Sequence, residues 1–287
     1  MFLAACCWLV FAPVLAAQSA PEDTARLIHQ SWFASASIRE SSALAASRKQ
    51  PGIFWTLNDS GNPAQLFAID SSGQSRGIVA VEGAENRDWE GLALARCRTG
   101  DCLYIADTGD NRQRRRSIRI FRVPEPATGS ASAPTISVNG SLELTYDDGP
   151  RNVEAIFVTP SQDLYLISKE RSGGGRLYHV GADAWGSPTG RAVARFIQEL
   201  PFPDGLGYQV TDAALHPDGE RVAVRTYRYI VFFRLRDGKL VADGPRCDAG
   251  GLDALGEGIT WLADGRLATT SERVMMLGGT ISLLECG

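Results

Sequence analysis

The chain has 287 residues, of which 44% are hydrophobic and 22% are charged, and its formal net charge at pH 7 is −4. This composition is close to the average for a soluble globular protein and excludes a disordered or collagen-like chain. The 29 Lys and Arg residues are balanced by 33 Asp and Glu. We therefore expect no nucleic-acid partner, because no overall basic field is present to attract one.

The first 17 residues carry no charge, contain an apolar stretch and end in small residues. Residues 1–17 are predicted to be a secretory signal peptide, with residues 18–287 as the mature domain. The stretch is too short for a transmembrane helix and is interrupted by Pro13, so we expect no transmembrane segment in the mature chain. A lipoprotein-like cleavage sequence ends at Cys6, but too few residues precede it to favour lipidation.

A unit of three apolar segments, separated by Gly- and Asp-rich turns, occurs five times along the chain. Each unit opens with an acidic or small polar residue, and these residues are Ser42, Glu90, Glu154, Asp212 and Glu257. The second segments are residues 53–57, 103–106, 164–167, 222–224 and 267–269. The third segments are residues 65–69, 118–123, 176–180, 230–235 and 280–284. They are rich in β-branched and aromatic residues, which favour strands.

Repeated units of this size with three or four strands are typical of a β-propeller. We predict an all-β chain that forms a single propeller with five blades; six blades are the alternative if the linkers contain another. Fourth strands are expected at residues 77–81, 141–146 and 191–200, with a weak one at 240–241. The fifth unit lacks a fourth strand, so residues 26–38 are predicted to pair there and close the ring. Residues 124–139 are expected to form a surface loop.

Four cysteines follow the predicted signal peptide: Cys97, Cys102, Cys247 and Cys286. An even number in an exported chain favours two disulfides over a metal cluster. The spacing favours Cys97–Cys102 across a short turn and Cys247–Cys286 at the C-terminus, although three pairings are open. We expect a periplasmic or secreted protein.

In a propeller of this topology, the start of each first strand and the end of each second strand lie on one face, because antiparallel strands alternate in direction. Four carboxylates are therefore expected at one mouth of the channel, and they are Glu90, Glu154, Asp212 and Glu257. The ends of the second strands add further oxygen ligands, namely Asp59, Asp107, Asp110 and Asn111.

Converging carboxylates need a cation, basic partners or protons, because they repel one another. A site built of oxygen ligands suits Ca²⁺ better than a soft metal. In the alternative interpretation, the acids bind neighbouring backbone N–H groups and are neutralised by basic residues, namely Arg87, Arg151, Lys169 and Arg225. Both interpretations are open from the sequence.

Two further features of the sequence bear on function. Residues 112–116 contain four arginines directly after Asn111, a run that either grips a phosphate or carboxylate or is a solvated loop. The three histidines, His29, His179 and His216, all fall outside the predicted mouth. A Ser-His-Asp catalytic triad and a zinc site with His ligands are therefore not expected there.

Five segments carry a resemblance to known proteins: Asn58-Asp59-Ser60-Gly61-Asn62, Asp88-Trp89-Glu90-Gly91-Leu92, Leu103-Tyr104-Ile105-Ala106-Asp107-Thr108-Gly109-Asp110-Asn111, Tyr146-Asp147-Asp148-Gly149-Pro150-Arg151-Asn152-Val153-Glu154-Ala155 and Gly256-Glu257-Gly258-Ile259. Through them, residues 40–275 resemble a family of exported bacterial β-propellers of unassigned function. More distantly, the chain is similar to the phytase-linked esterase-like propellers and to the gluconolactonase and strictosidine-synthase-like groups. The resemblance implies a propeller with its site at the channel mouth, but no particular reaction. The chain departs from the lactonase pattern in lacking suitably placed Asn ligands and a channel His.

Two functions from different classes follow. In the first, an exported propeller binds a small molecule or a protein at the channel mouth, with or without a bound cation. In the second, a Ca²⁺-assisted hydrolase cleaves an ester or phosphoester at the same mouth. The hydrolase requires a strongly perturbed carboxylate among the four mouth acids, whereas the binding module would have all four paired with basic side chains.

Overall fold

The structure is a computed structural model that describes residues 22–98, 100–129, 134–200, 202–203, 205–252, 255–273 and 278–287. The predicted signal peptide lies outside these residues. The described chain consists of strands β1 to β23 and two short 3-10 helices, η1 (Ala182–Gly186) and η2 (Leu206–Tyr208). In this part of the chain, no helix has the length and apolarity needed to cross a membrane.

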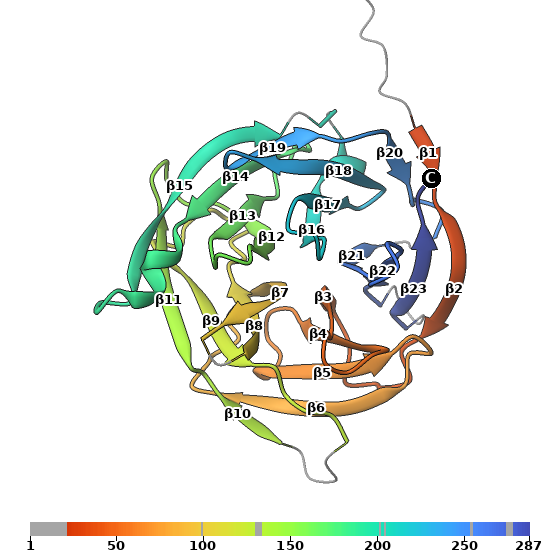
Figure 1. The fold of residues 1–287 in the computed structure, drawn as a ribbon, viewed down its shortest axis with the longest axis horizontal. Helices are drawn as coiled ribbons and strands as arrows, with labels where there is room; N and C mark the ends of the chain where they lie inside the picture. Colours follow the sequence, from red (N-terminus) through yellow and green to blue (C-terminus); the bar gives the residue numbers. More distant parts are fainter. Residues whose placement is uncertain are drawn as a thin grey trace, which may run out of the picture.

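Five innermost strands surround a central axis (Figure 1). They are β3 (Ser41–Ala46), β7 (Trp89–Cys97), β12 (Val153–Val158), β16 (Val210–Leu215) and β21 (Gly256–Trp261). Each packs beside the next in this order, and β21 packs beside β3. The five strands therefore form a closed ring.

Further strands extend outward from each innermost strand in antiparallel pairing. The second strands are β4 (Ile53–Asn58), β8 (Gly100–Asp107), β13 (Leu164–Ser168), β17 (Arg221–Thr226) and β22 (Leu267–Ser271). The third strands are β5 (Gln65–Asp70), β9 (Ile118–Pro124), β14 (Gly175–Val180), β18 (Tyr229–Arg236) and β23 (Thr280–Glu285). All ten lie where the repeat predicts them.

The outermost strands complete four hydrogen-bonded sheets. They are β2 (Arg26–Trp32), β6 (Ser75–Glu82), β11 (Gly140–Tyr146), β15 (Arg191–Leu200) and β19 (Lys239–Ala242). Strands β11 and β15 pair in parallel and so join two neighbouring groups into one eight-stranded sheet. The predicted pairing between the N-terminal and C-terminal segments is confirmed, since β2 pairs antiparallel with β23. The strand is shorter than predicted and ends at Trp32.

Three short strands were not predicted: β1 (Glu22–Thr24), β10 (Thr135–Ser137) and β20 (Arg246–Asp248). Strand β10 corrects the prediction that residues 124–139 form only a loop, because it pairs in parallel with β6. None of the three contains an apolar run that marks a strand in the sequence. They form because the outer edge of a sheet offers unpaired backbone groups to any segment that passes it.

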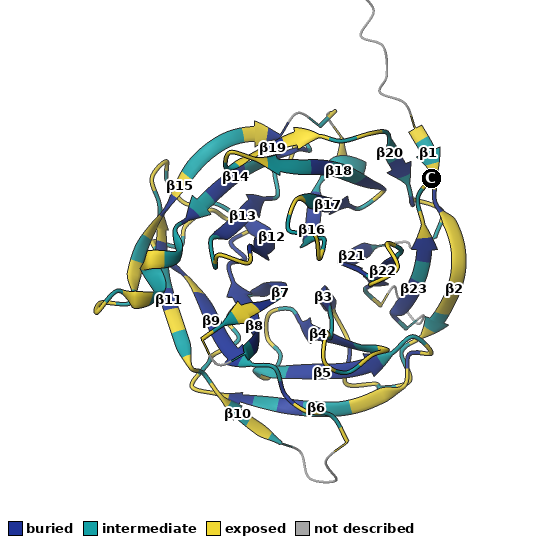
Figure 2. Ribbon diagram, viewed as in Figure 1, coloured by how far each residue is buried: buried dark blue, intermediate teal, exposed yellow. Residues whose placement is uncertain are grey.

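The core consists of five buried apolar clusters, each between two neighbouring groups of strands. Between the β7 and β12 groups, for example, Tyr104, Ile156 and Tyr178 pack together with no exposed surface. Burial is greatest in the inner strands, whereas β2 and parts of β6 and β15 are exposed (Figure 2). Trp55 and Trp89 are fully buried core residues.

The two expected disulfides, Cys97–Cys102 and Cys247–Cys286, are present. The first joins the end of β7 to β8, and the second joins β20 to the residue after β23. Together with the pairing of β2 and β23, the second bridge holds the two described ends of the chain against the ring.

Candidate cation site at the acidic mouth of the channel

Each innermost strand begins with a β-bulge, where its register with the second strand shifts. A bulge turns a side chain out of the regular alternation of a strand. The bulge residues are Ser42, Glu90, Glu154 and Thr211, with Glu257 and Gly258 together in β21. Glu90, Glu154 and Glu257 thereby gather at one end of the ring, together with Asp59, Asp88 and Glu272, and we call these six residues the acidic mouth.

Asp212 does not belong to the acidic mouth, which corrects the sequence prediction. The residue of β16 that is equivalent to Glu90 is Thr211, and Asp212 stands one position later. Its carboxylate accepts hydrogen bonds from the backbone N–H groups of Leu44 at 3.3 Å, Ile259 at 2.8 Å and Ala213 at 2.8 Å. Asp212 therefore bridges three innermost strands, which is the structural role considered in the sequence analysis.

Three carboxylates converge most closely at the acidic mouth. Asp59 follows β4, Asp88 precedes β7 and Glu90 lies within β7; one carboxylate oxygen from each lies within 4.8 Å of the other two. Gly109 makes room for them, because a Cβ atom there would lie 2.4 Å from Asp88 Oδ2 and 2.7 Å from Glu90 Oε1. Ser42 Oγ donates a hydrogen bond to Glu90 Oε2 at 3.1 Å.

Burial and mutual repulsion raise the pKa values of this cluster. The pKa of Asp88 rises to about 7, first through burial and then through the charge and hydrogen bond of Asp59. Burial followed by the charge of Glu154 raises the pKa of Glu90 well above its usual range. The pKa of Glu272 rises to about 7 through burial and the charge of Asp59. Without a cation, the acidic mouth therefore holds protons near neutral pH.

Lys169 supplies the positive charge for the two other glutamates of the innermost strands, Glu154 and Glu257. Its Nζ lies 3.1 Å from Glu154 Oε2 and donates to the Tyr227 hydroxyl at 2.9 Å. Burial alone would lower the pKa of Lys169, but the charges of Glu154 and Glu257 outweigh it and raise that pKa. Burial still raises the pKa of Glu257 well above its usual range. One lysine thus serves two glutamates.

The other predicted charge partners are placed differently. Arg225 is fully buried, packs against Gly256, and its charge lowers the pKa values of Asp212 and Glu257 in opposition to burial. Arg87 is exposed, and among the described residues it forms no ion pair with the acidic mouth. It therefore does not act as the predicted partner.

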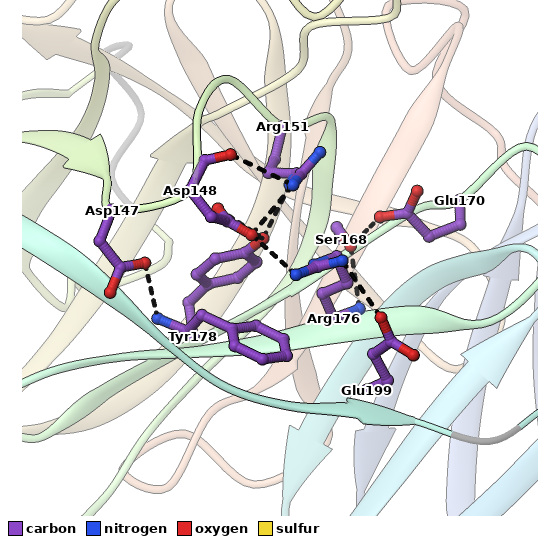
Figure 3. Close-up of polar contacts among 9 residues, drawn as sticks. Asp147, Asp148, Arg151, Ser168, Glu170, Arg176, Tyr178 and Glu199 are labelled. Carbon is purple, nitrogen blue, oxygen red and sulfur yellow. Dashed lines mark hydrogen bonds and ion pairs between the residues drawn. The ribbon is translucent and has the colours of Figure 1, made fainter.

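Arg151 also lies outside the acidic mouth and belongs to a separate cluster (Figure 3). Its Nε donates to the Tyr178 hydroxyl at 2.8 Å, and its Nη2 lies 2.9 Å from Asp148 Oδ2. Arg176 Nη2 contacts the same Asp148 oxygen at 2.9 Å. The Arg151 side chain is bonded to the Asp148 carboxylate and the Tyr178 hydroxyl, so it does not neutralise the acidic mouth.

The loop that follows β8 holds part of the acidic mouth in place through hydrogen bonds. Asp107 accepts hydrogen bonds from the Asp88 backbone N–H and from Arg115 Nη1, both at 3.0 Å. Asp110 accepts the Arg115 backbone N–H at 2.6 Å. Asn111 is exposed, and its carbonyl accepts a hydrogen bond from Arg171 Nη2 at 2.9 Å. Asp107 and Asp110 therefore hold the loop and Asp88 in place.

Sequence reasoning missed several residues of the site. It treated residues 112–116 as one basic run, although Arg115 is nearly buried in its ion pair with Asp107. It did not select Tyr227 or Asn152, whose Nδ2 donates to Glu154 Oε1 at 2.7 Å. It also missed Thr211, which fills the bulge position that glutamate takes in other repeats and that the sequence assigned to Asp212.

The geometry of the closest three carboxylates fits a hard divalent cation. Ca²⁺ binds six to eight oxygens at about 2.4 Å, so oxygens up to about 5 Å apart can share one ion. The oxygens of Asp59, Asp88 and Glu90 meet this limit. All three are hard carboxylate ligands, which favours Ca²⁺ over softer metals.

No protein-family model matches the chain, and no curated protein matches it in sequence. Among solved structures, it is similar to the PQQ-bound aldose sugar dehydrogenase of Streptomyces coelicolor, with a TM-score of 0.56 and 11% identity over 93% of this chain and 100% of that one. It is also similar to the major Malassezia sympodialis allergen Mala s 1, with a TM-score of 0.59 and 11% identity over 91% and 97%. At this identity the likeness concerns the fold alone. The chain therefore has a β-propeller-like fold.

Proposed function

We propose that the acidic mouth binds one divalent cation of the Ca²⁺ type through Asp59, Asp88 and Glu90. The observation that carries the proposal is the approach of three carboxylates that lack an arginine or lysine of their own within ion-pair distance among the described residues. A cation removes their repulsion and replaces the protons that Asp88 and Glu90 hold otherwise. The bound ion then forms the platform on which a small molecule or protein contacts this face.

The ring around this site is, we infer, a five-bladed propeller of an exported protein. The five innermost strands form a closed ring, and five apolar clusters lie between neighbouring groups of strands, which supports a count of five blades. In this count, the eight-stranded sheet consists of two blades joined at their outer edges. Two disulfides support a periplasmic or secreted location, because such bridges persist in oxidising compartments.

Titration calorimetry of the metal-free protein with CaCl₂ tests the cation site. We expect one ion per chain, and we expect Asp88→Asn to weaken binding at least tenfold because it removes one charged ligand. Asp264→Asn is the matched control, since Asp264 lies in an exposed turn and pairs only with Arg266 among the described residues. Equal Ca²⁺ heats for wild type and Asp88→Asn, or none for wild type, would contradict the proposal.

Gly109→Ala provides an independent variant that changes no ligand. The added methyl group would overlap the carboxylates of Asp88 and Glu90 and push them apart. We expect weaker Ca²⁺ binding with little change in stability without metal, because the far ends of both side chains can move. Unchanged Ca²⁺ affinity in this variant would show that the ion binds elsewhere.

The second candidate function is a Ca²⁺-assisted hydrolase of an ester or phosphoester. It is favoured by Glu272, which is not one of the three proposed ligands and whose pKa of about 7 suits proton transfer near neutral pH. Exposed arginines in the loop after β8, Arg112 and Arg114, supply positive charge for a phosphate. A panel of ester and phosphoester substrates, with Ca²⁺ and with chelator, tests it. Turnover that is lost in Glu272→Gln while Ca²⁺ binding is kept supports the hydrolase, and no turnover leaves cation binding alone.

A further inference from the structure

A pocket of about 580 Å³ lies at the end of the ring opposite the acidic mouth. The innermost strands begin at the acidic mouth and their later residues line this pocket, including Leu94 of β7, Phe157 of β12, Leu215 of β16 and Trp261 of β21. Ala93 of β7 adds a small side chain to the wall. The pocket has the size and the mainly apolar wall of a small-molecule site.

The walls also carry polar backbone groups. Among the described strands, each innermost strand is hydrogen-bonded to another strand on its outer side alone, so its inner edge pairs with no strand. Asp212 accepts hydrogen bonds from the inner-edge N–H groups of Leu44 and Ile259. Closer to the pocket, Thr260 Oγ1 accepts a hydrogen bond of 3.1 Å from the Ala46 N–H. Inner-edge groups therefore accompany the apolar side chains around the pocket, as in many ligand sites.

Arg48 lines this pocket on one side, and Lys49 and Arg96 share its partner Asp101; we call these three basic residues the basic rim. Arg48, in the loop between β3 and β4, lines the pocket, and its Nη2 donates to the Leu94 carbonyl at 3.2 Å. Arg48, Lys49 and Arg96 lie 3.7, 3.8 and 3.5 Å from the carboxylate of Asp101. Three cations thus surround one carboxylate, which leaves a local excess of positive charge on a chain whose net charge is −4.

The geometry of the basic rim leaves Arg48 available to a further anion. Its contact with Asp101 at 3.7 Å exceeds hydrogen-bond length, which is about 2.7 to 3.2 Å for N–H donors. About half of the Arg48 side chain is exposed, whereas Asp101 is 4% exposed. Arg48 can therefore hold its place on Leu94 and still present N–H groups to a carboxylate in the pocket opening.

We propose that this pocket binds a small amphipathic carboxylate, with its apolar chain between the innermost strands and its carboxylate on Arg48. The apolar walls account for the chain, and the excess charge of the basic rim accounts for the anionic head. The site is separate from the acidic mouth and does not depend on the cation proposed there.

Calorimetry with octanoate and decanoate, in chelator and below micelle-forming concentrations, tests the apolar part. Burial of one methylene contributes about a fourfold change in Kd, so we expect decanoate to bind roughly 15 times more tightly than octanoate. Absence of decanoate binding at millimolar concentration, or equal Kd values for both acids, overturns the proposal. Chelator in every titration keeps this result independent of the cation site.

Arg48→Gln tests the head group against an uncharged probe of the same chain length. We expect it to weaken decanoate binding about tenfold and to change 1-decanol binding less than twofold. Arg195→Gln is the control, because Arg195 is an exposed arginine on β15 that does not line the pocket. An equal loss for decanoate and 1-decanol, or no loss for decanoate, overturns the role of Arg48.

Filling the pocket gives the final test. Ala93→Phe places a ring in the pocket and is expected to abolish binding of both probes. Ala263→Phe, at an exposed position of the pocket lining, does the same with less risk to folding. A change in tryptophan fluorescence on addition of decanoate to wild type, absent in Trp261→Phe, reports occupancy at this end of the ring. Unchanged decanoate affinity in a folded filling variant shows that binding is elsewhere and overturns the proposal.

Discussion

Two buried carboxylates on different sides of the ring show how one residue type serves two purposes. Asp212 on β16 and Glu90 on β7 both stand near the start of an innermost strand, and they are 0% and 5% exposed. Asp212 is surrounded by backbone donors from three strands. Glu90 faces the carboxylates of Asp88 and Glu154, and among the described residues Ser42 alone donates a hydrogen bond to its side chain.

The difference arises from a single residue of register. Glu90 occupies the bulge of its strand, whereas the bulge of β16 is occupied by Thr211 and Asp212 follows it. Since side chains alternate along a strand, a shift of one residue changes which surroundings a side chain enters. Burial raises the pKa of both carboxylates well above the usual range. At Asp212, three backbone donors and the charge of Arg225 oppose this rise, whereas at Glu90 the charges of neighbouring carboxylates add to it.

The largest expected effect comes from removing the Asp212 carboxylate. Asp212→Ala leaves three buried backbone N–H groups without their acceptor, at about 1 to 3 kcal/mol each before relaxation. We expect the free energy of unfolding to fall by about 3 to 5 kcal/mol in urea denaturation with chelator. Asp212→Asn keeps an acceptor oxygen and should lose less. A loss below about 1 kcal/mol in the alanine variant would remove the distinction between the two carboxylates.

The next largest effect on the free energy of unfolding is expected at Lys169. This residue combines the two roles, because it neutralises carboxylates of the acidic mouth and also stabilises the fold. Lys169→Met leaves Glu154 and Glu257 without their shared ammonium group, and breaking a buried ion pair costs about 3 to 5 kcal/mol. Protonation of the glutamates reduces this loss, so we expect about 2 to 3 kcal/mol at pH 6 and more at pH 8. Urea denaturation at both pH values measures it, and a loss that does not grow with pH contradicts the assignment.

The sequence predicted the fold better than the site. The repeat places all five innermost strands, because each buries apolar residues with a pattern that local sequence shows. It also places Glu90 and Glu154 at the acidic mouth. It misplaces Asp212 because a bulge cannot be seen in a single sequence, and a one-residue offset looks like an ordinary variation of spacing.

Side-chain partners were predicted least well, for a physical reason. Arginine has a long, flexible side chain, so the position of its Cα does not decide which carboxylate it reaches. Arg151 turns to Asp148 and Tyr178, and Arg87 remains exposed. Conversely, Arg115 lies in a run that looks solvated but forms an ion pair with Asp107 at 3.0 Å.

Glu90→Gln sharpens the comparison with a smaller effect on folding. The glutamine keeps an acceptor oxygen for Ser42 and removes one charge from a repulsive cluster. In chelator we expect the free energy of unfolding to change by less than about 1 kcal/mol, or to rise. In Ca²⁺, wild type should gain stability through the bound ion and the variant should gain little. Thermal melts with Ca²⁺ and with chelator measure both; strong destabilisation of the variant in chelator would assign Glu90 a structural role.

The smallest effect is expected in the pH dependence of stability. Asp88 and Glu272 have pKa values of about 7 in the folded protein, raised from their usual values of 3.8 and 4.5 mainly by burial. Between about pH 4 and pH 7, the folded state therefore holds protons that the unfolded state has lost. The contribution of these groups to stability falls as pH rises through this window and levels off above it.

Calcium must displace these protons, so the stabilisation that it provides should grow from pH 5.5 to pH 7.5 and then level off. The pKa of His216 is lowered by burial, so this group acts in the opposite direction and its contribution to stability increases as pH rises. Asp88→Asn isolates the acidic mouth, because His216 is unchanged in it. Melts in chelator should fall less steeply with pH in this variant than in wild type, and the growth of the Ca²⁺ effect should disappear. Parallel curves of melting temperature against pH for the two proteins would mean that Asp88 does not titrate in this range. Asp88 would then be surrounded by hydrogen-bond donors, as Asp212 is.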